Sequence, residues 1–185
     1  KEQSLENFKG MFSFVIYDFE NKKCILARDR FGMKPLYYYN DKNFLIACSE
    51  IKPILKFLNK TKFNENAFSD FFIKGHMDHG ENTFFNDIKS LPPATYKIVS
   101  QNSDKEKYYW NLGDVKKDKS LGIKKTKIKL KGLFNNAIQE HLESDVEIGS
   151  CLSGGNDSSS ISSKSNSLLN YKMKTFTYEF KDQVS

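Results

Sequence analysis

The sequence has 185 residues, of which 38% are apolar, with sixteen Phe and nine Tyr; this composition excludes a disordered chain because it can supply a buried core. The formal net charge is +6, but the excess is mostly lysine, so charge alone does not establish a nucleic-acid partner. No apolar run reaches the roughly 20 residues of a membrane span. The three cysteines, at 24, 48 and 151, are too far apart in the sequence to form a Cys-x-x-Cys zinc motif. We therefore expect a reduced, cytoplasmic protein.

The first half of the chain begins with short apolar and aromatic segments separated by polar turns. Such a pattern predicts successive β-strands that pair antiparallel with their neighbours through tight turns. The predicted strands lie within 10–18, 22–30, 35–39 and 44–49.

Two helices are predicted next, at 49–58 and 64–75. Ser49 and Asn64 are placed to act as N-caps, because their side chains can accept a hydrogen bond from a first-turn N–H group. Gly75 is placed just past the end of the second helix, where a left-handed residue is common.

A change in composition then marks a domain boundary. Segment 83–110 is predicted to be irregular apart from a strand at 94–100, and residues 111–127 are rich in glycine and lysine, as in an exposed connection. We therefore expect one domain at 1–110, a linker at 111–127 and a second domain at 128–185.

The second domain begins with an amphipathic helix that ends near Leu142. Apolar residues recur at steps of three and four, which predicts one buried face. That face would contain Leu130, Leu133, Phe134, Ala137, Ile138 and His141. A strand at 146–152, a helix at 157–170 and a strand at 174–180 follow, an order that requires two parallel strands and a crossover.

The turn at 153–156 reads Ser-Gly-Gly-Asn and follows the first of these strands. Ligands of such units bind beyond the carboxyl ends of the strands, where the helix N-terminus presents free N–H groups. Gly154 and Gly155 would let the backbone bend and approach an anion closely. Further donors are the hydroxyl groups of Ser153, Ser158 and Ser159. The arrangement predicts a phosphate-binding loop.

Asp157 would repel phosphate unless a cation lies between them. Mg²⁺ is typically bound by one or two carboxylates together with substrate phosphates, so a magnesium-assisted loop resolves the conflict. A Walker loop is excluded because Asn156, not lysine, follows Gly155. The seven serines within 158–167 also suit a flexible linker, but the flanking strand and helix favour the loop.

These motifs resemble the glutamine-dependent asparagine synthetases. "SDVEIGSCLSGGNDSSSIS" (144–162) resembles the pyrophosphatase loop of that family. Other matching segments, from its glutaminase domain and the connection that follows, are "LENFKGMFSFVIYD" (5–18), "ARDRFGMKPLYYY" (27–39), "CSEIKPIL" (48–55), "NTFFNDIKSLPPATY" (82–96) and "YYWNL" (108–112). The resemblance implies the C-terminal half of an α+β, Ntn-hydrolase-like αββα glutaminase, followed by the N-terminal part of an α/β, parallel-sheet PP-loop ATP pyrophosphatase.

In this family an N-terminal cysteine hydrolyses glutamine, and the ammonia reaches a second site where ATP adenylates aspartate; ammonia then displaces AMP. The resemblance implies ATP and Mg as cofactors, with Asp157 acting through Mg. The implied phosphate-binding residues are Ser153, Gly154, Gly155, Asp157, Ser158 and Ser159, and the implied adenosine contacts are Leu152 and Tyr178. Implied partners are ATP, aspartate and glutamine, with no nucleic acid and no membrane, and the full-length protein could form a homodimer.

No cysteine lies at or near Lys1, and the family's second ATP- and aspartate-binding motifs would follow Ser185. We therefore expect an internal fragment that contains no catalytic residue and is inactive by itself. Two positions depart from the family's loop: Asn156 replaces an apolar residue and Glu147 replaces a proline.

Three alternatives stay open at this point. The enzyme could amidate another carboxylate, on a sugar or a β-amino acid. A tRNA-modifying or NAD-synthesising enzyme could share the loop, but would leave residues 5–112 unexplained. A non-enzymatic basic binding module could contain the Gly/Ser stretch as a linker.

Two further clusters are interpreted as structural. Arg28, Asp29 and Arg30 are expected to form a charge network that supports a turn. His76 and His79 lack further metal ligands nearby and are expected in a surface loop.

Overall fold

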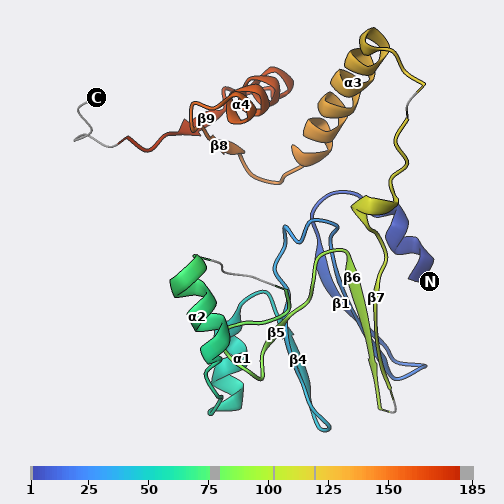
Figure 1. Cartoon of the computed structure of the whole chain (residues 1–185), viewed down its shortest axis with the longest axis vertical. Helices are drawn as coiled ribbons and strands as arrows, with labels where there is room; N and C mark the ends of the chain where they lie inside the picture. Colours follow the sequence, from blue (N-terminus) through green and yellow to red (C-terminus); the bar gives the residue numbers. More distant parts are fainter. Residues whose placement is uncertain (1, 76–79, 102, 119, 180–185) are drawn as a thin grey trace. The chain divides into compact units, whose positions relative to one another are not determined.

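The computed structural model in Figure 1 describes residues 2–75, 80–101, 103–118 and 120–179, so His76 and His79 lie outside the described residues. The chain divides into two compact units, Lys1–Lys116 and Lys117–Ser185, and the division falls within segment 111–127. The fold is mixed α/β, with antiparallel sheets in the first unit and a parallel strand pair in the second. None of the described helices combines the length and apolar character needed to cross a bilayer.

The first unit contains a four-stranded antiparallel sheet in the order β1-β2-β6-β7. Its strands are β1 (Ser13–Asp18), β2 (Lys23–Arg28), β6 (Thr95–Ser100) and β7 (Asp104–Tyr108). Asp18 closes the β1–β2 hairpin, because its carboxylate accepts hydrogen bonds from the backbone N–H and the side-chain amide of Asn21.

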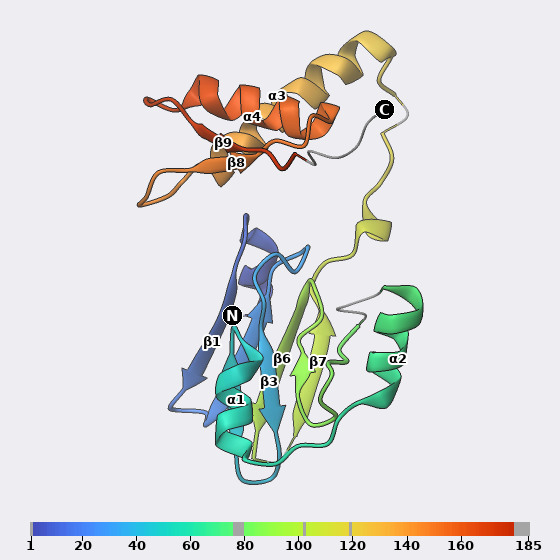
Figure 2. The same ribbon diagram turned by 90° about the vertical axis from the view of Figure 1, so that its left-hand side faces the viewer.

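A second sheet has the order β4-β3-β5 and packs against the first (Figure 2). Its strands are β3 (Tyr37–Asn40), β4 (Leu45–Cys48) and the short β5 (Lys89–Ser90). The core between the sheets contains the buried residues Leu26, Leu36, Tyr38 and Leu91. A second cluster, around Leu5, Ala27 and Tyr96, covers the opposite face of β2 and β6.

The prediction that all four early strands pair in succession is wrong at one step. β1 pairs with β2 and β3 pairs with β4, but β2 pairs with β6, and β3 pairs with β5. The chain changes sheets between β2 and β3 because a turn at 29–34 satisfies its own backbone groups without strand pairing.

Asp29, which is 1% exposed, organises this turn. Its carboxylate accepts four backbone N–H groups, with N···O distances of 3.0 to 3.3 Å; the donors are Phe12, Phe31, Met33 and Lys34. Gly32, at φ +64°, lies where a Cβ atom would come within 2.9 Å of Pro93. The turn therefore depends on both a buried carboxylate and a glycine.

The arginines beside Asp29 also bind backbone rather than carboxylates. Arg28 donates to the carbonyl oxygens of Gly32, Lys34 and Leu91 and to the hydroxyl of Ser90. Arg30 donates to the Glu6 carbonyl and lies over the Trp110 ring. The expected structural network is therefore present, but as hydrogen bonds, mostly to backbone atoms. Within the described part of the chain, these three residues form no ion pair with one another.

Tyr109 ties β7 to this turn, because its hydroxyl donates to the Arg28 carbonyl at 2.9 Å. Burial, and then the nearby Asp29 carboxylate, raise the pKa of Tyr109 to about 12, whereas an unfolded tyrosine titrates near 10. Folding therefore favours the neutral phenol, and this contribution to stability is complete below about pH 10 and is lost between about pH 10 and 12.

We expect the free energy of unfolding to fall more steeply over this alkaline range in the parent than in Tyr109→Phe. Urea denaturation, followed by the fluorescence of Trp110, the single tryptophan, measures the free energy of unfolding of both proteins at each pH. Equal slopes for the two proteins would contradict the assigned environment of Tyr109.

Helices α1 (Ile51–Leu58) and α2 (Glu65–Lys74) lie between β4 and β5 in the chain, and α1 packs on β3 and β4 (Figure 2). The Asn64 cap is confirmed, because its side chain accepts from the Ala67 N–H, and Gly75 ends α2 at φ 68°. The Ser49 cap is wrong: α1 begins after Glu50, whose side chain makes no capping bond.

The sequence reading missed two strands and two short 3₁₀ helices. β5 has only two residues, and β7 reads Asp-Lys-Glu-Lys-Tyr, which has no apolar alternation to reveal a strand. The 3₁₀ helices are η1 (Glu2–Asn7) and η2 (Leu112–Asp114).

The second unit contains α3 (Ile123–His141), β8 (Gly149–Cys151), α4 (Asn156–Leu168) and β9 (Lys174–Phe176). β8 and β9 are parallel, as predicted. The predicted buried face of α3 is largely wrong: Ile138 is buried, but Leu130 and Leu133 are 64% and 59% exposed. α4 and the short strand pair cover only part of this long helix.

Candidate functional site

The candidate site is the turn between β8 and α4. Gly154 has φ +80°, a left-handed conformation that favours glycine. Gly155 is the N-cap of α4, with ordinary extended dihedral angles, and a Cβ atom there would lie 3.6 Å from Ser153 Oγ. The two glycines therefore differ: the backbone geometry of Gly154 requires glycine, whereas that of Gly155 does not.

Serine hydroxyls line this turn. Ser153 Oγ and Ser158 Oγ are 3.0 Å apart, and Ser158 Oγ also donates to the Gly155 carbonyl at 3.2 Å. Ser159 follows in the same helical turn, and its N–H bonds the Gly155 carbonyl. The structure thus brings the three predicted serines to one end of α4.

The N-terminus of α4 has no side-chain cap, because its N-cap residue is a glycine. The first-turn N–H groups and the positive end of the helix dipole are therefore available to an anion. Asp157 lies in that first turn and is exposed. Within the described ranges, no three His, Cys, Asp or Glu side chains group to hold a metal, so a cation here would need phosphate oxygens in addition to Asp157.

Leu152 and Tyr178 emerge at the same edge of the parallel pair. The Leu152 N–H donates to the Phe176 carbonyl at 2.8 Å, and Thr177 Oγ1 donates to the Leu152 carbonyl at 2.9 Å. Tyr178 is 81% exposed. The sequence did not predict this contact of Thr177, which joins the ends of the two strands.

The serine-rich sequence of α4 forms its buried face. Ser162 and Ser165 are 6% and 5% exposed, whereas Ile161 is 45% exposed. Ser162 Oγ lies 2.8 Å from Ser150 Oγ of β8. Serine side chains therefore pack this helix on β8, because small hydroxyl side chains let the helix approach the strand and can hydrogen-bond to each other.

The two departures from the family loop lie at the surface. Asn156 is exposed as the first residue of α4, so it replaces no packing there. Glu147 forms an exposed ion pair with Lys174 at 2.9 Å, which is expected to contribute little to stability.

Two families match this chain. Residues 2–110 match the family described as glutamine amidotransferase domain. Residues 129–185, which contain the turn between β8 and α4, match the family described as asparagine synthase.

Curated relatives agree with these matches. Asparagine synthetase (glutamine-hydrolyzing) 2 of Bacillus subtilis (strain 168) is 34% identical over 168 residues, which cover 85% of this chain and 22% of the relative. Asparagine synthetase (glutamine-hydrolyzing) 3 of the same organism is 31% identical, over 87% of this chain and 26% of the relative. Amidase chry2 of Gibberella zeae is 28% identical, over 95% of this chain and 28% of the relative. The chain thus spans about a quarter of the length of these relatives.

Proposed function

The chain belongs to the glutamine-hydrolysing asparagine synthetase family, and from this membership we propose that it is part of an enzyme that makes asparagine from aspartate, ATP and glutamine. The observation that carries the proposal is the Ser-Gly-Gly-Asn-Asp-Ser turn at an uncapped helix N-terminus, inside the segment that matches asparagine synthase. The matches favour this enzyme over a non-enzymatic basic binding module.

We propose a finer fold and division of the chain. Residues 1–110 would form the C-terminal half of an Ntn-hydrolase-like αββα glutaminase, and 128–185 the start of a parallel-sheet PP-loop ATP pyrophosphatase. Residues 111–127 would link them, although α3 already begins at Ile123. The two packed antiparallel sheets and the parallel β8–β9 pair support this assignment.

The proposed nucleotide site uses the β8–α4 turn. The backbone of Gly154 and Gly155 and the hydroxyls of Ser153, Ser158 and Ser159 would bind the ATP phosphates. Leu152 and Tyr178 would contact the adenosine part from the ends of β8 and β9. The uncapped α4 N-terminus favours negative charge at this place.

Asp157 would hold Mg²⁺ together with the phosphates, and the single exposed carboxylate of the turn fits a cation that arrives bound to its nucleotide. When bound, Mg²⁺ neutralises phosphate charge and stabilises the pyrophosphate leaving group. The residues of the turn would orient the phosphates and supply hydrogen bonds to the charge that develops on pyrophosphate.

The proposed reaction has two steps. An oxygen of the aspartate side chain attacks the α-phosphorus of ATP, and the bond to the β-phosphate breaks to release pyrophosphate. Ammonia from glutamine then attacks the acyl carbon of the aspartyl-adenylate, and AMP leaves as the amide forms and a proton is released.

Small molecules would be the partners of this enzyme, with no nucleic acid or membrane involved, and the full-length protein would form a homodimer. We also propose a cytoplasmic location. The free thiols of Cys24, Cys48 and Cys151 are consistent with a reducing compartment.

Calorimetric titration of the full-length protein with Mg-ATP tests the nucleotide site. Asp157→Asn keeps the size of the side chain and removes the charge that would hold Mg²⁺, so we expect at least about tenfold weaker binding of Mg-ATP. Asp114→Asn removes the same charge from η2 and is expected to leave the affinity unchanged. Equal affinities for the parent and Asp157→Asn would contradict the proposed role of Asp157.

A second candidate function has the same ATP-dependent amide synthesis but a different acceptor carboxylate in place of aspartate. The departure from the family loop at the exposed Asn156 favours it. Assays of the full-length protein with aspartate and with other carboxylates, each in the presence of Mg-ATP and glutamine, distinguish the two candidates by which acid drives release of AMP.

A further inference from the structure

β7 separates its charges between the two faces of the four-stranded sheet. Its residues 104–108 read Asp-Lys-Glu-Lys-Tyr, and successive side chains of a strand point to opposite faces. Asp104 and Glu106 therefore share one face, and Lys105 and Lys107 share the other. A strand with balanced charges thus presents a purely cationic pair on one side.

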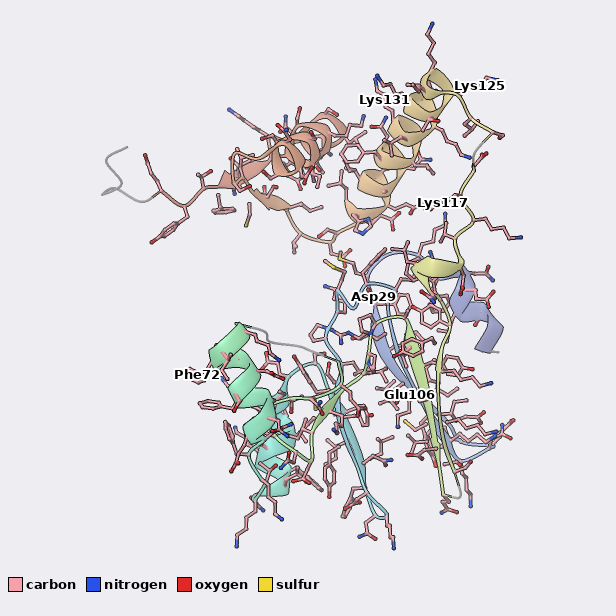
Figure 3. The ribbon with its side chains drawn as sticks, in the orientation of Figure 1. Asp29, Phe72, Glu106, Lys117, Lys125 and Lys131 are labelled. Carbon is pink, nitrogen blue, oxygen red and sulfur yellow. The ribbon has the colours of Figure 1, made fainter. Side chains whose placement is uncertain are left out.

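The two carboxylates of β7 have partners on their own face, Lys97 of the neighbouring strand β6 and Asn40 of the second sheet. Glu106, labelled in Figure 3, lies 3.3 Å from Lys97 Nζ, and Lys97 in turn lies over the ring of Tyr38 on β3. Asp104 accepts a hydrogen bond of 2.6 Å from the side-chain amide of Asn40. These carboxylates are therefore directed away from Lys105 and Lys107.

On the other face, the strand register adds a third lysine. Lys23 of β2 pairs with Ser100 of β6, while Tyr96 and Ile98 of β6 pair with Lys107 and Lys105. These residues, with Ser103, line a hollow of about 150 Å³. We call it the β7 hollow, and its lining contains three lysines and no acidic residue.

The three lysines have no ion pair within the described part of the chain. The nearest acidic residue by register is Asp18, which pairs with Lys23 across the β1–β2 hairpin. Both carboxylate oxygens of Asp18 already accept hydrogen bonds from Asn21. Positive charge therefore accumulates around the β7 hollow without a matching carboxylate in its lining.

We propose that the β7 hollow binds a small oxyanion with two or more negative charges, of the phosphate and pyrophosphate class. Ammonium groups act as point charges toward phosphate oxygens, and a multivalent anion would relieve the mutual repulsion of the three lysines. The Ser103 hydroxyl can reorient to donate to the anion, whereas the Ser100 hydroxyl already donates to the Ser103 carbonyl at 2.8 Å. The volume is well above the roughly 10–15 Å³ that a single water molecule needs on the same measure, so the hollow has room for a small oxyanion.

This site lies in the first unit and does not rest on the proposed nucleotide site. Phosphate could also bind the β8–α4 turn, so the titrations use the full-length protein with Gly155→Val, which is expected to block that turn. Calorimetry with inorganic phosphate and with pyrophosphate, at constant ionic strength, then measures the affinity of the β7 hollow for each anion. Loss of Mg-ATP binding by Asp157→Asn is measured separately, so either proposal can fail alone.

We expect the double variant Lys105→Gln/Lys107→Gln to weaken anion binding at least about tenfold, because each lysine supplies a charge-assisted hydrogen bond. The matched control is Lys125→Gln/Lys131→Gln, which removes equal charge from exposed lysines of α3 (Figure 3). We expect the control to bind the anion as the parent does. An equal loss in both double variants, or no heat of binding for either anion in the parent background, would overturn the proposal.

Discussion

Gly155→Val is expected to weaken Mg-ATP binding by at least about 100-fold without unfolding the protein. The valine methyl groups would occupy the space through which a phosphate approaches the α4 N-terminus, and each charge-assisted hydrogen bond lost there is worth about 1.5–3 kcal/mol. Calorimetric titration of the full-length protein with Mg-ATP measures the loss, and circular dichroism checks the fold.

The structure makes Gly155 the more informative of the two glycines. Its dihedral angles suit any residue, and a Cβ atom there meets Ser153 Oγ only at ordinary contact distance. Gly154 has φ +80°, so any substitution there adds backbone strain to the loss of ligand contact.

Gly132→Val is the control for the insertion itself, since a Cβ atom at this position of α3 has open space. We expect this control to bind Mg-ATP as the parent does, with a small gain in helix propensity because glycine is the poorer helix former. Undiminished affinity of Gly155→Val would show that phosphate does not approach this turn, and the proposed nucleotide site would then be wrong.

Asp29→Ala is expected to destabilise the first unit by about 4 kcal/mol or more. The substitution leaves four backbone N–H donors without their acceptor in a buried place, and each unsatisfied buried donor costs about 1–3 kcal/mol. Asp29→Asn should lose roughly half as much, because the amide oxygen can still accept from two of the four donors. Urea denaturation followed by Trp110 fluorescence measures both variants.

Asp41→Ala is the matched control for Asp29. Asp41 also accepts two backbone N–H groups in a turn, from Asn43 and Phe44, but it is exposed. Water can replace its carboxylate, so we expect only a small change in the urea midpoint. If Asp29→Ala unfolded at the same urea concentration as Asp41→Ala, Asp29 would not organise the 29–34 turn.

Features that depend on neighbours in the sequence could be predicted without the structure. The Asn64 cap and the end of α2 at Gly75 rest on residues within one helical turn of each other. The strand-turn-helix-strand order around residues 153–156 likewise follows from local composition. Local hydrogen bonds and dihedral preferences depend on residues that are close together in the sequence, so short motifs suffice to indicate them.

Other features required the tertiary structure, because they join residues far apart in the chain. β2 pairs with β6 rather than with β3, and only this pairing places Lys23 beside the lysines of β7. Ser162 of α4 meets Ser150 of β8, a contact that the serine-rich composition of the segment does not indicate.

The sequence by itself determined the family, the position of the phosphate-binding motif and most helices and strands of this protein. The tertiary structure decided which strands pair, which face of each helix is buried and where the lysines of β7 gather. The physical reason is that pairing and burial depend on long-range packing and on the turn that Asp29 holds, and no short window of sequence contains both partners of such contacts.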